Sequence, residues 1–321
     1  MKTQHYRIWE PEEYSYADAF GVIPKITSYL HEDGRTRPCM LVIPGGAYQV
    51  VSPTEAELVA LKFYNMDYQA FVLTYTTDIL EREPLKLQPL KDISRAVRMI
   101  RKHAEEFAVD PERLAICGFS AGGHLSASLC VHFADIQDED EAYAGISNRP
   151  DAAVLSYPVI SSGVWKHAGS IQSLLGENPT KEELEYMSLE TQVTEQTTPC
   201  FVWATETDDA VPVENSERFV KALREKKVPC AFHMFSHGPH GLSLADEDWA
   251  NAVHMPAYTV EQIQGALKKI EAGELAVSKR TWALDFGTQW GSGSVSKVGE
   301  PNAEVAVWPI LADAFLKHLF Q

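Results

Sequence analysis

The sequence predicts an α/β fold in which a mainly parallel, doubly wound sheet is flanked by helices. Short apolar runs of strand length alternate with helix-like segments over most of the chain. Strands that alternate with helices form parallel sheets with both faces covered. In addition, the strand-like run at residues 113–117 leads almost directly into the alanine- and leucine-rich segment 121–131. Such sheets bind ligands at the carboxyl ends of their strands, so candidate functional residues are expected there.

Each element follows from its own pattern of side chains. Apolar runs of five to eight residues predict buried strands. Apolar side chains at three- and four-residue steps, as in residues 93–107, are typical of a helix that packs on a sheet. The expected strands, in chain order, are residues 25–31, 39–43, 70–75, 113–117, 151–157, 200–204 and 228–235. The expected helices are residues 52–65, 93–107, 121–131 and 308–320.

Residues 246–302 break this alternation, and we interpret them as an insertion before the final helix of a single domain, residues 1–321. An amphipathic helix is expected to start near Thr259, which has capping-box spacing to Gln262, and to stop at Gly273. The insertion is expected to act as a lid, as a contact in a homo-oligomer, or as local core. The side chains on which these alternatives depend are aromatic: Trp282, Phe286 and Trp290.

Composition narrows the class of protein. The 321 residues carry a formal net charge of −17, which argues against nucleic-acid or anionic-membrane partners bound through bulk electrostatics. The five cysteines are odd in number and form no C-x-x-C pair, so reduced thiols and a cytoplasmic location are expected. Residues 1–7 lack the apolar region of a signal peptide, and no stretch is long enough to span a bilayer. No H-E-x-x-H or other metal-ligand spacing occurs, so no metal is expected.

The segment Gly118-Phe119-Ser120-Ala121-Gly122 carries the strongest functional signal. It fits G-x-S-x-G and lies between a predicted strand and a predicted helix, which is the setting of a nucleophile elbow. The pentapeptide alone also occurs by chance in tight turns. A serine hydroxyl is a weak nucleophile, so a role for Ser120 requires a base, an acid and an oxyanion site elsewhere in the chain.

Loops after the last two predicted strands supply the base and the acid. His240 is the preferred base, because the loop between Pro239 and Gly241 can turn its ring inward. The competing histidines are His237, whose alternative is a surface loop position, His124, which is more often a structural contact, and His233, which alternates within a strand. Asp208 and Asp209 compete as the acid, which would hold the imidazole tautomer. Asp208 is preferred because it lies four residues before Pro212, a spacing familiar from this fold.

Backbone amides are the expected oxyanion donors. The Ala121 N–H lies at the positive end of the predicted helix after Ser120. Gly46 and Ala47 follow a predicted buried strand directly, and small residues there let the backbone approach a bound carbonyl. A plain loop is the alternative interpretation of this segment.

Four motifs in this order carry a resemblance: I-P-G-G-A-Y at 43–48, I-C-G-F-S-A-G-G-H at 116–124, V-P-V-E-N-S at 211–216 and G-P-H-G-L at 238–242. The chain resembles an α/β-hydrolase of the carbohydrate-esterase kind, similar to acetyl xylan esterases and BD-FAE-like esterases. The resemblance implies a Ser120–Asp208–His240 triad, oxyanion donors at Gly46, Ala47 and Ala121, and no cofactor. It further implies small-molecule substrates, namely small acyl esters that are often acetyl esters of sugars.

Two departures from the family pattern stand out. Ala47 occupies a position where a third glycine is common, and a positive φ there would cost Ala about 1 kcal/mol. The insertion at residues 246–302 is unusually long, so the family's substrate can be assigned to this chain only weakly.

The expected function is hydrolysis of small carboxylic esters by a serine enzyme, through an acyl-enzyme intermediate. Two alternatives remain open at this stage. The same triad suits an amidase or formamidase, and the fold also occurs in non-catalytic binding proteins.

Overall fold

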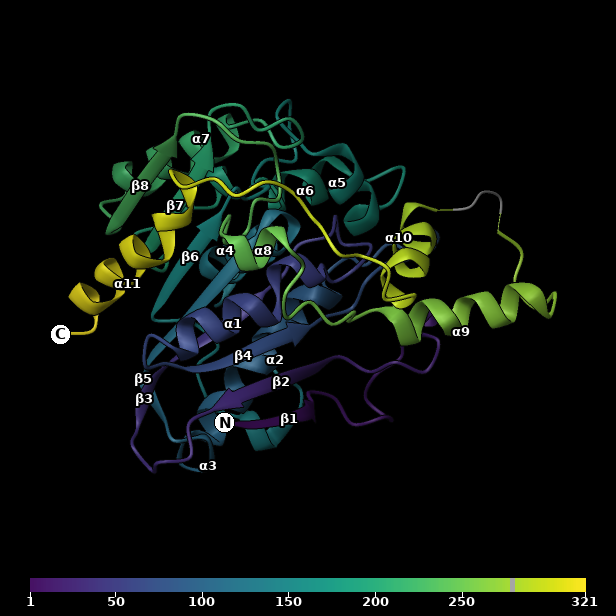
Figure 1. The fold of residues 1–321 in the computed structure, drawn as a ribbon, viewed down its shortest axis with the longest axis horizontal. Coiled ribbons are helices and arrows are strands. Elements are labelled where there is room, and N and C mark those ends of the chain that lie inside the picture. The colour runs from purple at the N-terminus through teal and green to yellow at the C-terminus, as the bar shows by residue number, and fades with distance from the viewer. Residues whose placement is uncertain (278–280) are drawn as a thin grey trace.

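An eight-stranded sheet organises the computed structural model of this chain, which describes residues 1–277 and 281–321 (Figure 1). The strand order is β1-β2-β4-β3-β5-β6-β7-β8. Pairing is parallel from β4 through β8 and antiparallel where β2 meets β1 and β4, which confirms the predicted fold class. The strands are β1 (Lys2–Arg7), β2 (Lys25–Leu30), β3 (Arg37–Ile43), β4 (Gln69–Thr74), β5 (Val109–Phe119), β6 (Ala152–Ser156), β7 (Cys200–Thr205) and β8 (Cys230–Phe235).

Helices cover both faces of the sheet. The sequence predicted helices at 52–65, 93–107, 121–131 and 308–320, whereas the helices at 168–186 and 214–225 were not predicted. The expected helix at 93–107 divides at His103, whose backbone leaves the helical region. The helices in the described residues are α1 (Glu57–Tyr64), α2 (Gln88–Lys102), α3 (Ala104–Phe107), α4 (Ser120–His132), α5 (Ala168–Leu175), α6 (Lys181–Tyr186), α7 (Glu214–Glu225), α8 (Glu247–Ala250), α9 (Val260–Glu271), α10 (Trp282–Gly291) and α11 (Trp308–Leu319).

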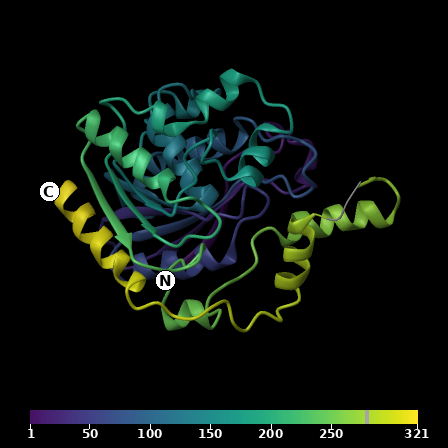
Figure 2. The same cartoon turned by 90° about the horizontal axis from the view of Figure 1, so that it is seen from above.

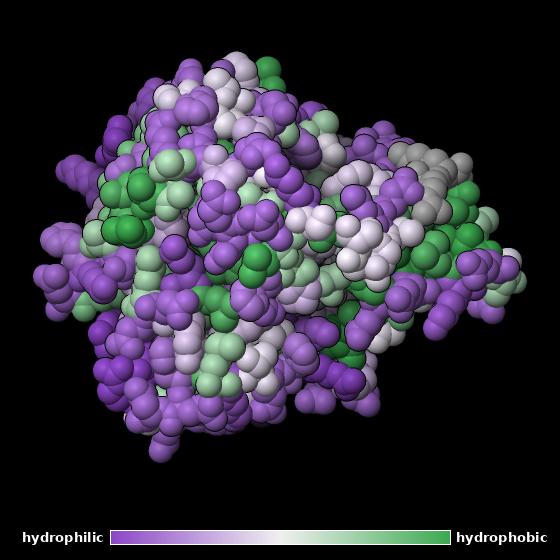
Figure 3. Space-filling model, viewed as in Figure 1, coloured by the Kyte–Doolittle hydropathy of each residue, from purple (hydrophilic) through white to green (hydrophobic). Residues whose placement is uncertain are grey.

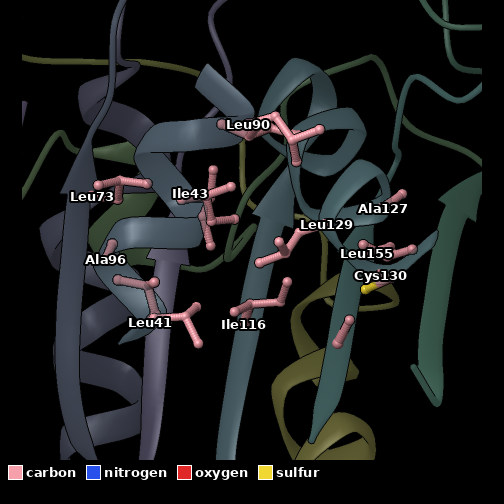
Figure 4. Packing of buried hydrophobic residues seen from close by; sticks show 14 of the residues in the cluster. Leu41, Ile43, Leu73, Leu90, Ala96, Ile116, Ala127, Leu129, Cys130 and Leu155 are labelled. Carbon is pink, nitrogen blue, oxygen red and sulfur yellow. The ribbon is translucent and has the colours of Figure 1, made fainter. Parts of the chain in front are cut away.

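Alternate residues of each central strand feed two separate cores. On β3, Leu41 and Ile43 belong to one hydrophobic cluster together with side chains of α2, α4 and α7. Figure 4 shows these residues against the helices on that face. Met40 and Val42 belong to the opposite cluster, which includes side chains of α1 and α11. Burial on both faces explains why the central strands are mostly apolar.

The turn from β5 into α4 is closely packed against the end of β3. A Cβ built on Gly122 would lie 2.2 Å from the Ile43 carbonyl oxygen and 2.4 Å from that of Pro44. A Cβ on Gly118 would lie 2.2 Å from the Ser126 hydroxyl oxygen. Only glycines therefore let the start of α4 pack against the end of β3, and this contact brings Ser120 close to the loop that follows β3.

Within residues 246–302, helices α9 and α10 form what we call the arm. The arm projects to one side of the sheet in both ribbon views (Figures 1 and 2). Ile263 of α9 and Leu284 of α10 form a small core with Val50, Ile79 and Leu80 of the main body. Hydrophobic side chains are visible at the outer end of the arm in the space-filling view (Figure 3). Residues 278–280 of the insertion lie outside the described residues.

The N-terminus of α9 differs from the expected capping box. Thr259 makes no side-chain capping hydrogen bond. Gln262 instead donates to the carbonyl oxygens of Asp18 and Thr77 and accepts from the Thr77 hydroxyl, so its amide fastens the arm to the body. The capping prediction was wrong because these tertiary hydrogen bonds use the side chain. The expected stop is present, since Gly273 follows the helix with φ = 70°.

The five cysteines are free in the structure. Cys39, Cys117, Cys130 and Cys200 are buried, and Cys230 is half-buried. Among residues 1–277 and 281–321, no helix combines the length and the apolar character that a bilayer span requires.

The contact at Gly122 gives a prediction about stability. We expect Gly122→Ala to lower the free energy of unfolding by about 1–3 kcal/mol, because backbone atoms of β3 must move to admit the methyl group. Urea denaturation measures this change. Gly169→Ala in α5 is the matched control, since its Cβ would meet nothing closer than the His167 ring at 3.5 Å. Equal stability of the two variants would contradict the packing argument.

Candidate active site

The loops after β5, β7 and β8 bring three of the predicted side chains together. The Ser120 hydroxyl oxygen lies 2.7 Å from His240 Nε2, and His240 Nδ1 lies 2.7 Å from Asp208 Oδ2. An ionised carboxylate can only accept a hydrogen bond, so Nδ1 carries the proton and Nε2 accepts from the serine hydroxyl. The three groups therefore form a continuous hydrogen-bonded chain with the geometry of a serine–histidine–acid triad.

Ser120 owes its position to a strained backbone. Its φ is 51°, in the left-handed region that non-glycine residues rarely adopt. It is the first residue of α4 and follows Phe119, which is still extended. Strain of this kind is common at functional sites, where the surrounding structure holds it in place. The side chain is nearly buried, with 7% of the residue exposed.

Both aspartates of the loop after β7 support His240, but they hold different parts of it. The Asp208 carboxylate is almost fully buried and also accepts from the Ala210 and Val211 N–H groups, which fixes its orientation. Asp209 accepts from the backbone N–H of His240 at 3.0 Å. This hydrogen bond lowers the pKa of the Asp209 carboxyl. The structure thus places Asp208 against the imidazole and Asp209 against the main chain.

The other histidines near the site point elsewhere. His237 is largely exposed and contacts Ser236 and Glu304, so it does not reach Ser120. His233 stacks on Phe201 within the sheet. These positions exclude His237 in its loop and His233 in its strand as the partner of Ser120.

The loop after β3, residues 44–48, presents the predicted oxyanion donors, and we call it the oxyanion loop. Gly46 and Ala47 line the same cavity of about 430 Å³ as Ser120 and His240. Within residues 1–277 and 281–321, neither the Gly46 N–H nor the Ala47 N–H donates to another protein group. Ala121 lies in the first turn of α4, where N–H groups have no intrahelical partner. The loop is also strained: Ala47 has φ = 56°, so the anticipated cost of about 1 kcal/mol applies to it.

His124 supports this loop from the interior and is fully buried. Its Nε2 lies 3.1 Å from the Met187 carbonyl oxygen, which can only accept, so Nδ1 accepts from the Tyr48 hydroxyl at 2.9 Å. Burial lowers the pKa of His124 to about 4. The ring is therefore neutral at pH 7 and ties the end of the oxyanion loop to the segment after α6.

Three further residues of the site were missed by the sequence analysis. Glu55 and His167 line the cavity, and the Tyr157 ring packs edge-on against His240 with centroids 4.9 Å apart. His167 accepts from Ser170 through Nδ1, and burial lowers its pKa. The spacing Ser52-Pro53-Thr54-Glu55 would suggest only a helix cap. Neither His167 nor Tyr157 belongs to a motif that the sequence displays.

The arm forms one wall of the cavity. Trp282 and Phe286 of α10 line it, together with the oxyanion loop and the polar side chains of Gln49 and His167. Trp282 is 48% exposed, which is unusual for so large an aromatic residue in a cavity wall. The Trp290 ring packs at a tilt against Phe286, with centroids 5.7 Å apart, but does not line the cavity. Two of the three aromatic residues of α10 thus line the cavity that holds Ser120.

No group of three or more His, Cys, Asp or Glu side chains in the described parts of the chain is arranged to hold a metal ion. The chemistry that the arrangement itself supports is transfer of an acyl group to and from Ser120.

Comparison with known proteins decides the family. The BD-FAE family model matches residues 28–223, which contain Ser120, Asp208 and the oxyanion loop. The chain belongs to the BD-FAE family. It has the α/β-hydrolase fold, and the comparisons support a hydrolase.

Individual proteins similar to this BD-FAE member are hydrolases by name. It is 52% identical over 83% of its length to endo-1,4-beta-xylanase B of Butyrivibrio fibrisolvens and 28% identical over 68% to an acetylxylan esterase of Xylanibacter ruminicola. It spans less than half of these two curated relatives, 42% and 46% respectively. A solved acetyl ester-xyloside bifunctional hydrolase from Caldicellulosiruptor lactoaceticus is 32% identical with a TM-score of 0.71, covering 85% of this chain and 97% of that one.

The buried His124 gives a prediction about pH. Its pKa is lower in the folded state than the ordinary 6.5, so the unfolded chain binds a proton that the folded chain resists. Acidification then favours unfolding: this contribution, about 3 kcal/mol, is present above pH 6.5 and is lost as the pH falls toward 4. We expect His124→Gln to be less stable at pH 7, because the Tyr48 contact is disturbed, but to lose less stability between pH 7 and pH 4. Urea denaturation at several pH values measures how the free energy of unfolding of each protein depends on pH. The same dependence in the wild type and in His124→Gln would contradict a lowered pKa of His124.

Proposed function

We propose that this BD-FAE member is a serine carboxylic-ester hydrolase that removes small acyl groups, chiefly acetyl groups, from sugars or oligosaccharides. The observation that carries the proposal is the hydrogen-bonded chain from Asp208 through His240 to Ser120, which ends in a cavity beside unpaired backbone N–H groups. Few arrangements other than acyl transfer use a hydroxyl, a base and oxyanion donors together.

The first step of the proposed reaction forms an acyl-enzyme. His240 Nε2 accepts the Ser120 proton as the hydroxyl oxygen attacks the ester carbonyl carbon. The carbonyl oxygen becomes an oxyanion that accepts from the Gly46, Ala47 and Ala121 N–H groups. Asp208 stabilises the imidazolium that forms on His240. The imidazolium then donates its proton to the leaving alcohol, and the acyl group remains on Ser120.

The second step returns the enzyme to its starting state. Water replaces the alcohol, His240 accepts a proton from it, and the resulting oxygen nucleophile attacks the acyl carbon. The same N–H groups bind the second oxyanion. Collapse of this intermediate releases the carboxylic acid, and Ser120 recovers its proton from His240. No other reactant than water is required.

The cavity favours a small acyl group and a larger alcohol. Ser120 is nearly buried beside the oxyanion loop, whereas Trp282, which lines the same cavity, is half-exposed. Ligand sites combine aromatic walls with a few placed polar groups, and here Gln49 and His167 are such groups. A sugar ring offers apolar C–H faces and polar hydroxyl edges, which match this wall. The named activities of the acetylxylan esterase and the acetyl ester-xyloside hydrolase support the same substrate class.

Replacement of Ser120 tests the proposal. We expect Ser120→Ala to lower kcat for p-nitrophenyl acetate by at least about 10⁴-fold, since the nucleophile is removed. Labelling by a fluorophosphonate should disappear with it. Ser128→Ala is the control: this buried serine of the same helix donates only to the His124 carbonyl oxygen and should leave activity unchanged. Full activity of Ser120→Ala would end the proposal, and faster turnover of N-formyl aryl amides than of aryl acetates would favour the amidase alternative.

Replacement of Trp282 tests the alcohol side of the cavity. We expect Trp282→Ala to raise KM for an acetylated xylo-oligosaccharide about tenfold, the equivalent of a contact of about 1.4 kcal/mol. Turnover of p-nitrophenyl acetate, whose alcohol offers no sugar ring, should change less than about threefold by the same measure. Trp290→Ala, on the same helix but outside the cavity, should behave as the wild type toward both. Equal effects of Trp282→Ala on the two esters would argue against a sugar-binding wall.

A further inference from the structure

Glu55 is a second buried carboxylate at this site, and no step of the proposed reaction uses it. It is 3% exposed and lies in the turn between the oxyanion loop and α1. It also lines the cavity that holds Ser120 and His240. We propose that Glu55 is a positioning residue, whose carboxylate fixes the oxyanion loop relative to the loop that carries His240. The inference rests on the proposed serine mechanism.

The first contact of Glu55 is to the oxyanion loop itself. Glu55 Oε2 accepts from the Gly45 N–H at 2.8 Å. The N–H groups of the next two residues, Gly46 and Ala47, are the proposed oxyanion donors. A Cβ on Gly45 would lie 2.9 Å from both Glu55 Oε2 and Ser120 Cβ, so the loop is held tightly between the carboxylate and the nucleophile. Movement of Gly45 would therefore shift the donors relative to Ser120.

The second contact reaches the histidine side of the site. Glu55 Oε1 accepts from the Tyr157 hydroxyl at 2.7 Å, and that hydroxyl accepts from the Ser243 N–H at 3.0 Å. Ser243 lies three residues after His240, and the Tyr157 ring packs edge-on against the His240 ring. Tyr157 has φ = 37°, a strained conformation at the end of β6. One carboxylate thus connects the loops after β3, β6 and β8.

These hydrogen bonds fit an ionised carboxylate. Each oxygen of Glu55 faces a different donor. Burial raises the pKa of the Tyr157 hydroxyl far above its ordinary value, so that group keeps its proton and donates it. Burial also raises the pKa of Glu55, which the hydrogen bonds from Tyr157 and Gly45 oppose. A buried charge is costly to folding, and a carboxylate retained here in spite of that cost is consistent with a positioning role.

Glu55→Gln tests this role with a side chain of the same shape. An amide can accept from only one of the two donors and presents its own N–H₂ to the other. We expect kcat for p-nitrophenyl acetate to fall about 10²-fold, the size of effect that a misplacement of about 1 Å produces. KM should change less than about threefold, because both oxygens of Glu55 already accept hydrogen bonds from protein groups and are not needed to bind the ester. The rate of fluorophosphonate labelling should fall with kcat, whereas the final labelled fraction should match the wild type.

Glu57→Gln is the matched control. Glu57 also accepts from a tyrosine hydroxyl, that of Tyr29 on β2 at 3.0 Å, but it does not line the cavity that holds Ser120. Its variant should retain wild-type kcat and KM. Tyr157→Phe provides a second test that keeps the ring against His240 and removes only the hydroxyl. We expect a tenfold loss of kcat from it with unchanged KM.

The outcomes separate this inference from the proposed mechanism. Wild-type kcat in Glu55→Gln, or a loss of activity that only follows a smaller labelled fraction, would overturn the positioning role. If Glu55→Gln does not fold, unchanged kcat in Tyr157→Phe would overturn it. If Ser120→Ala retains activity, the serine mechanism fails instead, whatever the Glu55 variants do.

Discussion

Parallel pairing of the central strands is the constraint on which the rest of the structure depends. Because β3, β5, β6, β7 and β8 run in the same direction, their carboxyl ends meet at one edge of the sheet. β3 is followed by the oxyanion loop, and the segments after the other four strands carry, in order, Ser120, Tyr157, Asp208 and His240. Residues more than 100 positions apart thereby come within hydrogen-bond distance. The two hydrophobic cores hold the strands rigid, so the loops inherit a fixed framework.

That edge of the sheet also concentrates backbone strain. Ala47, Tyr48, Ser120 and Tyr157 all have positive φ, and all lie in the loops that surround the cavity. Each such residue costs of order 1 kcal/mol or more. The compensation comes from contacts beneath the loops: Gly122 against β3, His124 against Tyr48, and Glu55 against Gly45. Strain and support together fix the directions of the hydroxyl, the imidazole and the N–H groups.

The sequence predicts those parts of the molecule whose physics is local. Apolar runs identify strands β2 to β8, and G-x-S-x-G between a strand and a helix identifies Ser120. By contrast, β1 is a polar edge strand whose residues are mostly exposed, so no apolar run predicts it. Thr259 and Gln262 have capping-box spacing, yet Gln262 bonds to distant backbone. Glu55 and Tyr157 gain their importance only from tertiary contacts with Gly45, Ser243 and His240, and no spacing along the chain encodes such contacts.

The attachment of the arm bears on how proteins of this architecture can diverge. Trp282 and Phe286 reach the cavity from α10, whereas the residues around Ser120 stand on strand ends. The two sets share no secondary-structure element, and Gln262 fastens the arm through hydrogen bonds that do not involve the cavity-facing side chains. Mutations on the inner face of α10 can therefore accumulate without disturbing the reacting groups. Under the proposed function, the preference for one alcohol over another can change in evolution while the residues proposed to transfer the acyl group stay constant.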